Sequence, residues 1–262
     1  LKPPVEAFTD PGFIITFVRH NNNNGPTHFY YSMNKGGVWS GPYSFPDLGT
    51  AGIANRTDYI VESDQELSVF LTTAKTNKKE GRVAFAKTTD GGINWEFVSL
   101  ITDEQEGFDI MPSSLRLSDT ELITIIRTRT AERQDLLTAY RSSDNGMSWA
   151  RLKNPVNDTG NGGSPPALVK LQDGRLALAY IYRSVYGSRV NVRFSSDNGE
   201  SWSDEVVLRS GDGANRDAGY PRMVQRPDGK LVLIYYWNNA NDEDSTPYRY
   251  IASTIFDPGK WK

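Results

Sequence analysis

The sequence of 262 residues contains no cysteine and only two histidines. Without cysteine, the chain has no disulfides and no thiolate metal sites. His20 and His28 flank a polar segment with no cluster of carboxylates beside them, so they predict surface positions and not a metal site. Gly160, Gly162 and Gly163 do not have the spacing of a nucleotide-binding loop. We therefore expect neither a metal nor another cofactor.

An excess of one charge and long apolar runs are also missing. Lys and Arg number 29 against 32 Asp and Glu, which leaves a net charge of −3. This balance gives no electrostatic basis for binding nucleic acid or an anionic membrane surface. No run approaches the roughly 18 apolar residues of a membrane span. We expect no nucleic-acid partner and no membrane span.

What the sequence does contain is a repeat. Four segments read hydroxyl residue, any residue, Asp or Asn, any residue, Gly, any two residues, Trp; they are residues 32–39, 88–95, 142–149 and 195–202. Their tryptophans, Trp39, Trp95, Trp149 and Trp202, are 56, 54 and 53 positions apart. A regular period of this size indicates a repeat architecture.

The motif predicts a structural role. Hydroxyl and carboxylate side chains can accept hydrogen bonds from backbone N–H groups in a tight turn. The glycine can adopt a positive φ that other residues resist. The tryptophan then begins the next strand and packs its ring under the turn. We interpret the motif as a hairpin staple and place no catalysis on it; a calcium site is the weaker alternative, because no run of further oxygen ligands follows.

Each period also contains four strand signals in the same order. In the fourth period they are residues 166–171, 175–182, 189–194 and 206–208. The second strands are nearly continuous apolar runs, at residues 13–18, 67–71, 122–126, 176–182 and 231–237. Half-exposed strands alternate between apolar and polar residues. Continuous runs therefore predict strands buried on both faces, as when sheets stack face to face.

These periods predict an all-β fold, a β-propeller of four-stranded antiparallel blades, as a single domain over residues 1–262. Five blades begin near residues 1, 50, 107, 161 and 217. The fifth has no staple and no clear fourth strand, and residues 1–8 are short and proline-rich for closing a ring. We expect that an N-terminal blade is missing from this chain and that the complete protein has six blades; a closed ring of five is the alternative.

The Ser-x-Asp-x-Gly-x-x-Trp motif at this period resembles the Asp-box, or BNR, repeat of the sialidase superfamily, over essentially the whole chain. Residues 218–230 are similar to a segment of bacterial sialidase-family proteins described as exo-α-sialidases. The resemblance implies a glycoside hydrolase that removes a terminal, acidic sugar from a glycan. It also implies a secreted or periplasmic protein. The oligomeric state is not predicted.

In that superfamily three arginines bind the sugar carboxylate, a tyrosine deprotonated by a glutamate is the nucleophile, and an aspartate is the acid/base. A neutral tyrosine avoids repulsion by the anionic substrate. Its ordinary pKa, near 10, requires a base beside it. Arginine suits the clamp because its planar fork matches a carboxylate.

Transferred position by position, the resemblance implies that Tyr220, at the start of the last blade, is the nucleophile. Arg189 matches the third arginine, which precedes the last Asp box. Arg127, after the apolar run 122–126, matches the second arginine, with Arg129 as the alternative. The competing interpretations are a core or rim tyrosine and surface arginines paired with nearby acids.

Two positions depart from the superfamily's pattern. Met111 occupies the place of the glutamate base, with Glu106 and Asp109 nearby but displaced, and we include Asp109 among the catalytic candidates. The first arginine and the acid/base aspartate belong to the first blades, and no Phe-Arg-Ile-Pro-like segment occurs. Asp58, next to Arg56 at the start of the second blade, is the substitute candidate for the acid, with Arg56 as a substrate-binding residue.

Arg222 and Asp217 complete the candidate site, because both put charge beside Tyr220 where a first strand faces the central channel. Two other functions stay open. Met111 in place of the glutamate, together with many aromatic residues that could stack on sugars, favours a non-catalytic carbohydrate-binding propeller. A polysaccharide lyase would use a tyrosine as base and arginine to neutralise a uronate.

Overall fold

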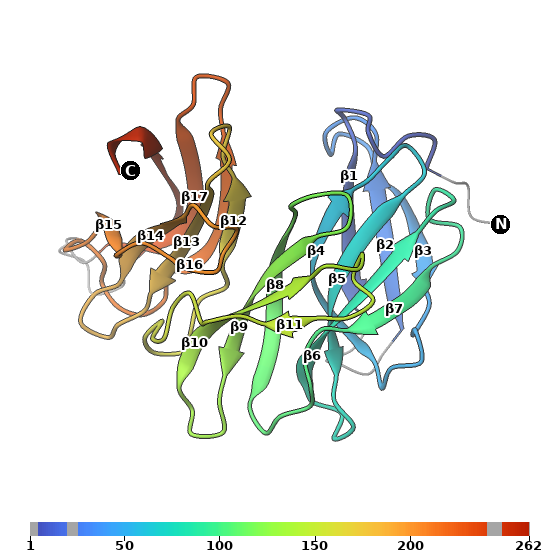
Figure 1. Cartoon of the computed structure of the whole chain (residues 1–262), viewed down its shortest axis with the longest axis horizontal. Helices are drawn as coiled ribbons and strands as arrows, with labels where there is room; N and C mark the ends of the chain where they lie inside the picture. The colour runs from blue at the N-terminus through green and yellow to red at the C-terminus, as the bar shows by residue number, and fades with distance from the viewer. Residues whose placement is uncertain (1–4, 20–25, 240–247, 262) are drawn as a thin grey trace. The chain divides into compact units, whose positions relative to one another are not determined.

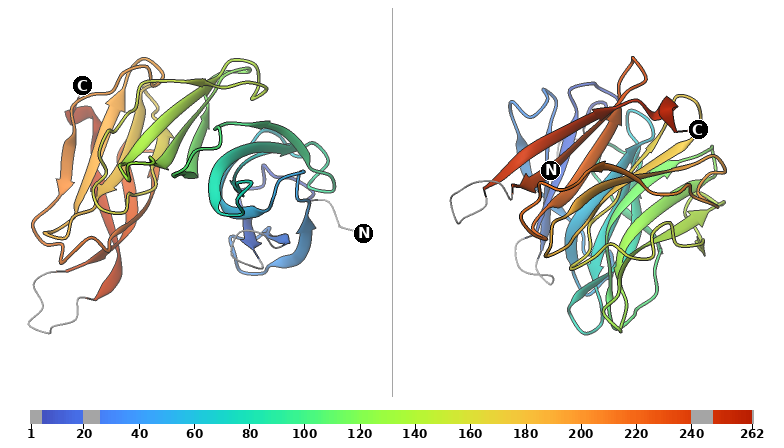
Figure 2. Two further views of the ribbon diagram at one scale, coloured as in Figure 1. Left: turned by 90° about the horizontal axis from the view of Figure 1, so that it is seen from below. Right: turned by 90° about the vertical axis from the view of Figure 1, so that its left-hand side faces the viewer.

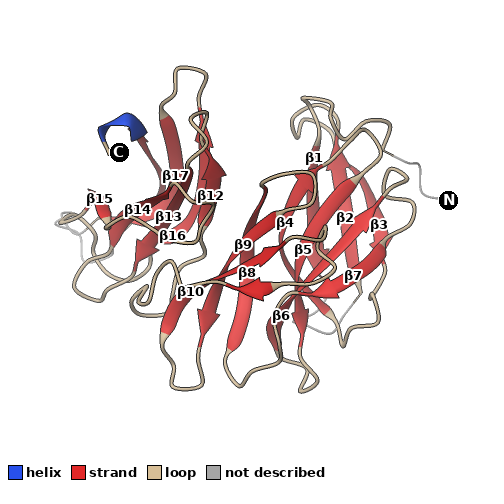
Figure 3. Cartoon of the chain, in the orientation of Figure 1, coloured by secondary structure: helices blue, strands red, loops and turns tan. Residues whose placement is uncertain are grey.

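Strands make up nearly all the regular structure of the computed structural model, which describes residues 5–19, 26–239 and 248–261 (Figure 3). The chain forms two compact units: Leu1–Leu122 with Ser142–Trp149, and Ile123–Arg141 with Ala150–Lys262. In the described ranges the only helix is the 3-10 helix η1 (Pro258–Lys260). No described helix is long and apolar enough to cross a membrane.

The strands are labelled in Figure 1. Up to the end of the third blade they are β1 (Ile14–Arg19), β2 (Thr27–Ser32), β3 (Ser40–Phe45), β4 (Ile53–Val61), β5 (Leu67–Ala74), β6 (Glu80–Thr88), β7 (Glu96–Leu100), β8 (Phe108–Arg116), β9 (Leu122–Arg129), β10 (Asp135–Ser142) and β11 (Ala150–Arg151). The remaining strands are β12 (Ala167–Lys170), β13 (Leu176–Tyr182), β14 (Arg189–Ser195), β15 (Val206–Arg209), β16 (Gly219–Gln225), β17 (Leu231–Asn238) and β18 (Arg249–Phe256).

These strands form five sheets in which neighbours follow the order of the chain: β1-β2-β3, β4-β5-β6-β7, β8-β9-β10-β11, β12-β13-β14-β15 and β16-β17-β18. Figures 1 and 2 show the strands of each sheet side by side. Successive strands in one sheet joined by short turns are antiparallel by necessity. The fold is a β-propeller of five blades, as the sequence predicted, with three strands in the first and last sheets and four in the others.

The fourth blade shows how closely the strand signals located the structure. Its strands β12 to β15 cover residues 167–170, 176–182, 189–195 and 206–209. In the register, Leu178 lies opposite Leu168 on β12 and opposite Arg193 on β14. The prediction for this blade is confirmed to within two residues at each boundary.

The expectation that second strands are buried on both faces is confirmed for three blades and wrong for two. All eight residues of β5 are buried, and β9 and β13 are buried except for their last residue. In β1 and β17 burial alternates, and Val18 and Ile234 are 46% and 45% exposed. On β17, Leu233 and Tyr235 belong to the core of the second unit, whereas Ile234 between them points to the other face of the strand.

Packing of sheet on sheet creates the core of each unit. In the second unit Ile181 and Val192 of the fourth blade belong to one cluster with Leu233 and Trp237 of the fifth. In the first unit aromatic and aliphatic residues of β1 and β2 pack against β4 and β5. Each large apolar side chain buried in this way stabilises the fold by about 1.5–3 kcal/mol.

The staple has the predicted local geometry. In the third blade the Ser142 hydroxyl accepts from the backbone N–H of Gly146 at 2.8 Å and donates to Asp144 Oδ1 at 2.8 Å. Asp144 Oδ1 also accepts from the N–H of Ser148 at 2.9 Å. Asn145 and Gly146 have φ of 57° and 82°. A positive φ at these residues closes the turn, so the motif is structural.

The staple tryptophan reaches further than the sequence indicated. The Trp149 ring lies 6.1 Å from that of Phe85 in the preceding blade, and its Nε1 donates to Ser99 Oγ at 3.0 Å. In the same way Trp95 lies 4.9 Å from Phe45 of the first blade. Each of these two residues therefore ties its own hairpin to the blade before it.

Lys75 is a buried cation whose ammonium group is held by backbone carbonyls. Its side chain follows β5 and is 2% exposed. The Nζ donates to the carbonyls of Gln105, Glu106 and Gly107 at 2.7, 3.2 and 2.8 Å. The ammonium group loses its water on burial, and the three carbonyl dipoles take the place of that water. Lys75 thereby fixes the segment that leads into β8.

We predict that Lys75→Met lowers the free energy of unfolding by about 1–3 kcal/mol, because three partly buried carbonyls lose their donor. Lys79→Met is the matched control, since the Lys79 side chain is exposed. Thermal or denaturant unfolding followed by circular dichroism measures both. Equal stability of the two variants would contradict a structural role for the Lys75 ammonium.

The staples also predict a pH dependence of stability. Hydrogen bonds from Ser148 to Asp144 and from Ser201 to Asp197 lower the pKa of each carboxyl below its ordinary value. A group whose pKa is lower in the folded state contributes stability that is present above its unfolded pKa, about 4, and is lost as the pH falls. We therefore expect the melting temperature to fall on acidification below about pH 4.

The first blade provides the control for this effect. There Asn34 stands in place of the aspartate, and its Oδ1 still accepts from Ser32 Oγ at 2.9 Å and from Val38 N at 2.7 Å. Asp144→Asn should therefore keep the turn and reduce the acid-dependent loss of stability, measured as melting temperature between about pH 2 and pH 7. An acid sensitivity equal to that of the unmodified protein would show that the staple carboxylates do not cause it.

Candidate functional site

The second unit contains a cavity of about 820 Å³ where loops and strand ends of three blades meet. Its lining residues are Arg127, Arg129, Arg133, Asp135, Asn161, Gly162, Arg183, Val185, Asn215, Arg216 and Asp217. Five arginines face two aspartates, so the wall has an excess of positive charge. Such a cavity favours an anionic ligand.

Arg127 and Arg129, from the end of β9, are held on one side of this cavity. Arg127 is 9% exposed and its Nη2 donates to the carbonyl of Gly162. The N–H of Gly162 donates to Asp135 Oδ2 at 3.0 Å. Arg129 donates from Nε and Nη2 to the two oxygens of the same carboxylate, at 2.9 and 3.0 Å. The guanidinium of Arg129 is therefore paired with the Asp135 carboxylate, which also holds the backbone at Gly162 in place.

Arg183, directly after β13, also lines the cavity. Its Nε donates to the carbonyl of Ala218 at 2.7 Å, and its Nη2 donates to the Tyr236 hydroxyl at 3.3 Å. Its guanidinium lies 5.8 Å from the centre of the Tyr220 ring. Gly219, with φ of 153°, allows this close approach, because an added Cβ would collide with the guanidinium.

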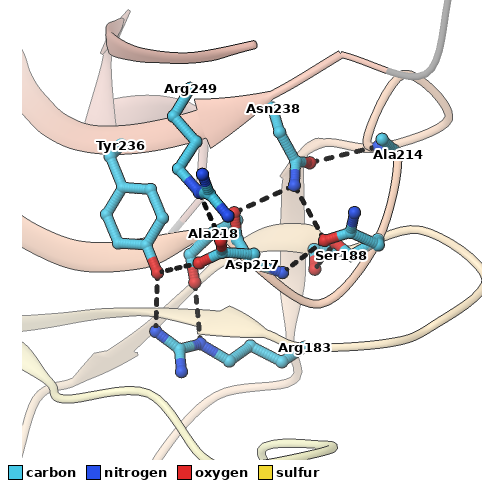
Figure 4. Close-up of polar contacts among 9 residues, drawn as sticks. Arg183, Ser188, Ala214, Asp217, Ala218, Tyr236, Asn238 and Arg249 are labelled. Atoms are coloured by element: carbon cyan, nitrogen blue, oxygen red, sulfur yellow. Dashed lines mark hydrogen bonds and ion pairs between the residues drawn. The ribbon is translucent and has the colours of Figure 1, made fainter. Parts of the chain in front are cut away.

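Figure 4 shows the polar network around Asp217. Tyr236 donates from its hydroxyl to Asp217 Oδ1 at 2.9 Å, and Arg249 donates from Nε to Oδ2. Asn238 donates from Nδ2 to the backbone carbonyl of Asp217 at 3.0 Å. Both carboxylate oxygens of Asp217 thus have a donor, and the network joins the end of β13 to β17 and β18 through Arg183.

The network shifts two pKa values in opposite directions. Burial raises the pKa of Tyr236 to about 12; Arg183 counteracts this, and Asp217 adds to the rise. Burial alone would raise the pKa of Asp217, but the hydrogen bonds from Tyr236 and Arg249 bring it below the ordinary value. At neutral pH the pair is therefore a neutral phenol and a carboxylate.

Tyr220 and Arg222 lie on β16, next to this network. Tyr220 is 49% exposed, and its ring lies 5.8 Å from that of Tyr236. Neither Tyr220 nor Arg222 is among the residues that line the arginine cavity. Arg222 is exposed and pairs in the register with Ile234. Of the residues predicted in the fifth blade, Asp217 contributes to the cavity wall and Tyr220 contacts its Arg183.

Arg189 occupies a different place. It lines a separate cavity of the fourth blade, of about 470 Å³. Its guanidinium stacks 4.5 Å from the ring centre of Tyr182, and its Nη2 lies 3.9 Å from Glu205 Oε1. The structure therefore brings Arg127, Arg129 and Asp217 to one cavity and Arg189 to another.

The other predicted residues belong to the first unit. Arg56 on β4 directs its Nη1 to the Met111 sulfur at 3.8 Å. Asp58 on β4 accepts from the N–H of Ser114 at 2.6 Å through Oδ2. Asp109 on β8 is 3% exposed. Arg56, Asp58 and Met111 thus come from two adjoining strands of this unit.

Three of these residues share an unusual backbone. Arg56, Met111 and Tyr220 have φ of 46°, 54° and 55°, and each lies near the start of the first strand of its blade. The register shifts around Arg56 and around Tyr220. Such bulges turn a side chain away from the regular alternation and are frequent next to active sites.

Sequence reasoning missed Arg183, Tyr236 and Arg249. Arg183 had a signal, because it follows an apolar second strand as Arg127 does. Tyr236 lies inside the apolar run 231–237, and nothing in that run indicates that its hydroxyl takes part in a polar network. Arg249 reaches Asp217 across 32 positions of the chain, which no local pattern reveals.

The described residues contain no group of three or more His, Asp and Glu side chains that could hold a metal. Of the two histidines, His28 lies on β2 and His20 lies outside the described residues.

The Tyr236–Asp217 pair gives a testable electrostatic prediction. Asp217→Asn removes the carboxylate charge that opposes the phenolate, so the pKa of Tyr236 should fall from about 12 towards 10. An NMR titration of Cζ-labelled tyrosine measures it, with Tyr236→Phe assigning the resonance. An unchanged pKa in Asp217→Asn would mean that the carboxylate does not act on this phenol.

Comparison with solved structures finds proteins whose fold is similar to that of this chain. A protein of unknown function from Dyadobacter fermentans is 20% identical, with a TM-score of 0.72 over 93% of this chain and 72% of that one. The NanB sialidase from Streptococcus pneumoniae is 15% identical, with a TM-score of 0.63 over 89% of this chain and 36% of that one. An α-L-arabinanase from Penicillium chrysogenum is 16% identical, with a TM-score of 0.60 over 92% of this chain and 82% of that one.

At these sequence identities, the similarity shows that the proteins share a fold and does not show a shared function. No curated protein sequence matches the chain. The family model described as a BNR repeat-like domain matches residues 10–233, which include all four staples. The chain therefore belongs to the BNR repeat-like family of sialidase-like β-propellers, as its Asp boxes predicted.

Proposed function

We propose that this protein is a glycoside hydrolase of the sialidase superfamily that removes a terminal, acidic sugar from a glycan outside the cytoplasm. The observation that carries the proposal is the arginine-lined cavity of the second unit. Five arginines against two aspartates favour an anionic ligand. The structural neighbours include a sialidase and an arabinanase, so glycan hydrolysis is an activity that this fold supports.

The carboxylate of such a sugar would bind to the arginines. Both aspartates in the wall already accept hydrogen bonds from arginine, Asp135 from Arg129 and Asp217 from Arg249. The wall therefore carries more positive charge than its own two aspartates balance. A planar guanidinium can give a carboxylate two parallel hydrogen bonds, which fixes the orientation of the sugar as well as its charge.

Two tyrosines are candidates for the nucleophile; neither lines the cavity, but both contact its Arg183. Tyr220 is the residue that the resemblance implies, and it is half-exposed beside Arg183. Tyr236 has the carboxylate that a phenol nucleophile needs, since its hydroxyl donates to Asp217 at 2.9 Å. Because the pKa of Tyr236 is about 12, its proton would move to Asp217 during attack and not before it. A covalent tyrosyl intermediate would give retention of configuration.

Non-catalytic binding is the second candidate function, and one observation favours it. The carboxylates of the cavity wall are both paired with arginine, and the pKa of Asp217 is lowered. Asp217 is therefore not suited to donate a proton to a leaving group at neutral pH. A protein with this wall and no acid beside it would bind acidic sugars without cleaving them.

The test measures turnover and binding by the same full chain. A panel of fluorogenic glycosides should include a sialoside, several uronic-acid glycosides and a neutral arabinoside. We expect cleavage of at least one acidic glycoside and none of the arabinoside. Arg183→Gln should raise KM about tenfold or more, and Tyr236→Phe or Tyr220→Phe should lower kcat by about 10²–10⁴-fold, whichever is the nucleophile.

The outcomes separate the candidates. Binding of an acidic sugar without cleavage, lost in Arg183→Gln, would leave the binding function and remove the hydrolase. Release of unsaturated, ultraviolet-absorbing products would identify a lyase. Neither binding nor cleavage of any acidic glycoside would overturn the interpretation of the arginine cavity.

A further inference from the structure

The second cavity of the fourth blade has a different chemistry from the arginine cavity. Its volume is about 470 Å³, within the range of about 300–1,000 Å³ common for small-molecule sites. Its floor is the face of β13 and β14, and one wall is the segment 153–158 that leads into the blade. All of it belongs to the second unit.

The floor is built by strand alternation. Tyr180 and Tyr182 lie on one face of β13, and in the register they are opposite Asn191 and Arg189 of β14. Side chains two residues apart on a strand point to the same face, so Arg189, Asn191 and Arg193 form a row. Both tyrosines and both arginines line the cavity. Asn191 lies on the same face between the two arginines, fully buried and not itself among the lining residues.

Asn191 is fully buried, yet its amide has no hydrogen-bond partner in the described chain. Its exposed fraction is 0%, and neither Nδ2 nor Oδ1 makes a hydrogen bond. The Nε atoms of Arg189 and Arg193 are also buried without an acceptor. A buried polar group left without a partner costs about 1–3 kcal/mol, and native structures have few of them. The row therefore has unmet capacity both to donate and to accept.

The charges of this cavity nearly balance. Lys153, Arg189 and Arg193 face Asp158 and Glu205. Glu205 accepts from the Tyr180 hydroxyl and lies 3.9 Å from Arg189 Nη2. An anion would meet these carboxylates unfavourably. A hydroxyl group, which donates and accepts, suits a wall that offers amides, carboxylates and guanidinium groups together.

The cavity also has apolar surface for a ring. Tyr182 and Trp202 both line it and are half-buried. Aromatic faces pack well against the C–H faces of a sugar, while polar side chains at the edge bind its hydroxyls. We infer that this cavity is a second saccharide site, which binds a neutral sugar unit and is separate from the arginine cavity.

Binding of neutral trisaccharides tests this inference without reference to turnover. The full chain would be titrated with xylotriose, arabinotriose, cellotriose and maltotriose, with trigalacturonate as the acidic comparison, by calorimetry and saturation-transfer NMR. We expect at least one neutral trisaccharide to bind. Asn191→Leu and Tyr182→Leu should each weaken that binding about tenfold or more, equivalent to about 1.4 kcal/mol.

Two controls make the result specific. Tyr186→Leu removes a tyrosine that is 97% exposed and lines neither cavity, so it should leave binding unchanged. Asn191→Leu replaces the amide by an apolar group of similar size and should keep or raise the melting temperature, which confirms that the variant folds. The inference is overturned if no neutral trisaccharide binds at about 10 mM. It is also overturned if binding persists in both Asn191→Leu and Tyr182→Leu. Failure of the hydrolase proposal would change neither outcome.

Discussion

Face-to-face packing of sheets is the constraint on which the rest of this protein depends. Val190 and Val192 of the fourth blade share a core with Leu231 and Leu233 of the fifth. In the second blade, every residue of β5 is buried. A sheet covered on both faces has no room for polar chemistry along its middle. Function is therefore confined to strand ends, connecting loops and the margins where one sheet extends past the next.

Both cavities lie at such strand ends and margins, and a different set of polar residues lines each of them. At the ends of β9 and β13, Arg127 and Arg183 emerge where the apolar runs stop, and backbone carbonyls of Gly162 and Ala218 hold them. Beside the segment 153–158, one face of β13 and β14 is left partly uncovered and carries tyrosine and arginine together. The fourth blade thus contributes to two chemically different cavities, because its two margins have different neighbours.

The sequence predicted the parts of the fold that rest on local patterns, and missed those that depend on distant contacts. The staples fixed the blade period, and apolar runs located the second strands, since both are properties of short segments. The one-sided burial of β17 was missed, because its sequence does not record which faces are covered. Arg127 and Asp217 could be predicted, as each lies next to a strand boundary. The partnership of Tyr236 with Asp217 and Arg249 could not, because bulges and register bring these residues together.

The positive φ shared by Arg56, Met111 and Tyr220 has an evolutionary consequence. The backbone conformation at this position, near the start of the first strand of a blade, sets the direction of the side chain. The same conformation therefore accepts an arginine, a methionine or a tyrosine. A different residue at such a position would change the chemical group displayed there while the scaffold stays the same. A repeat protein of this kind can therefore diversify its chemistry one blade at a time.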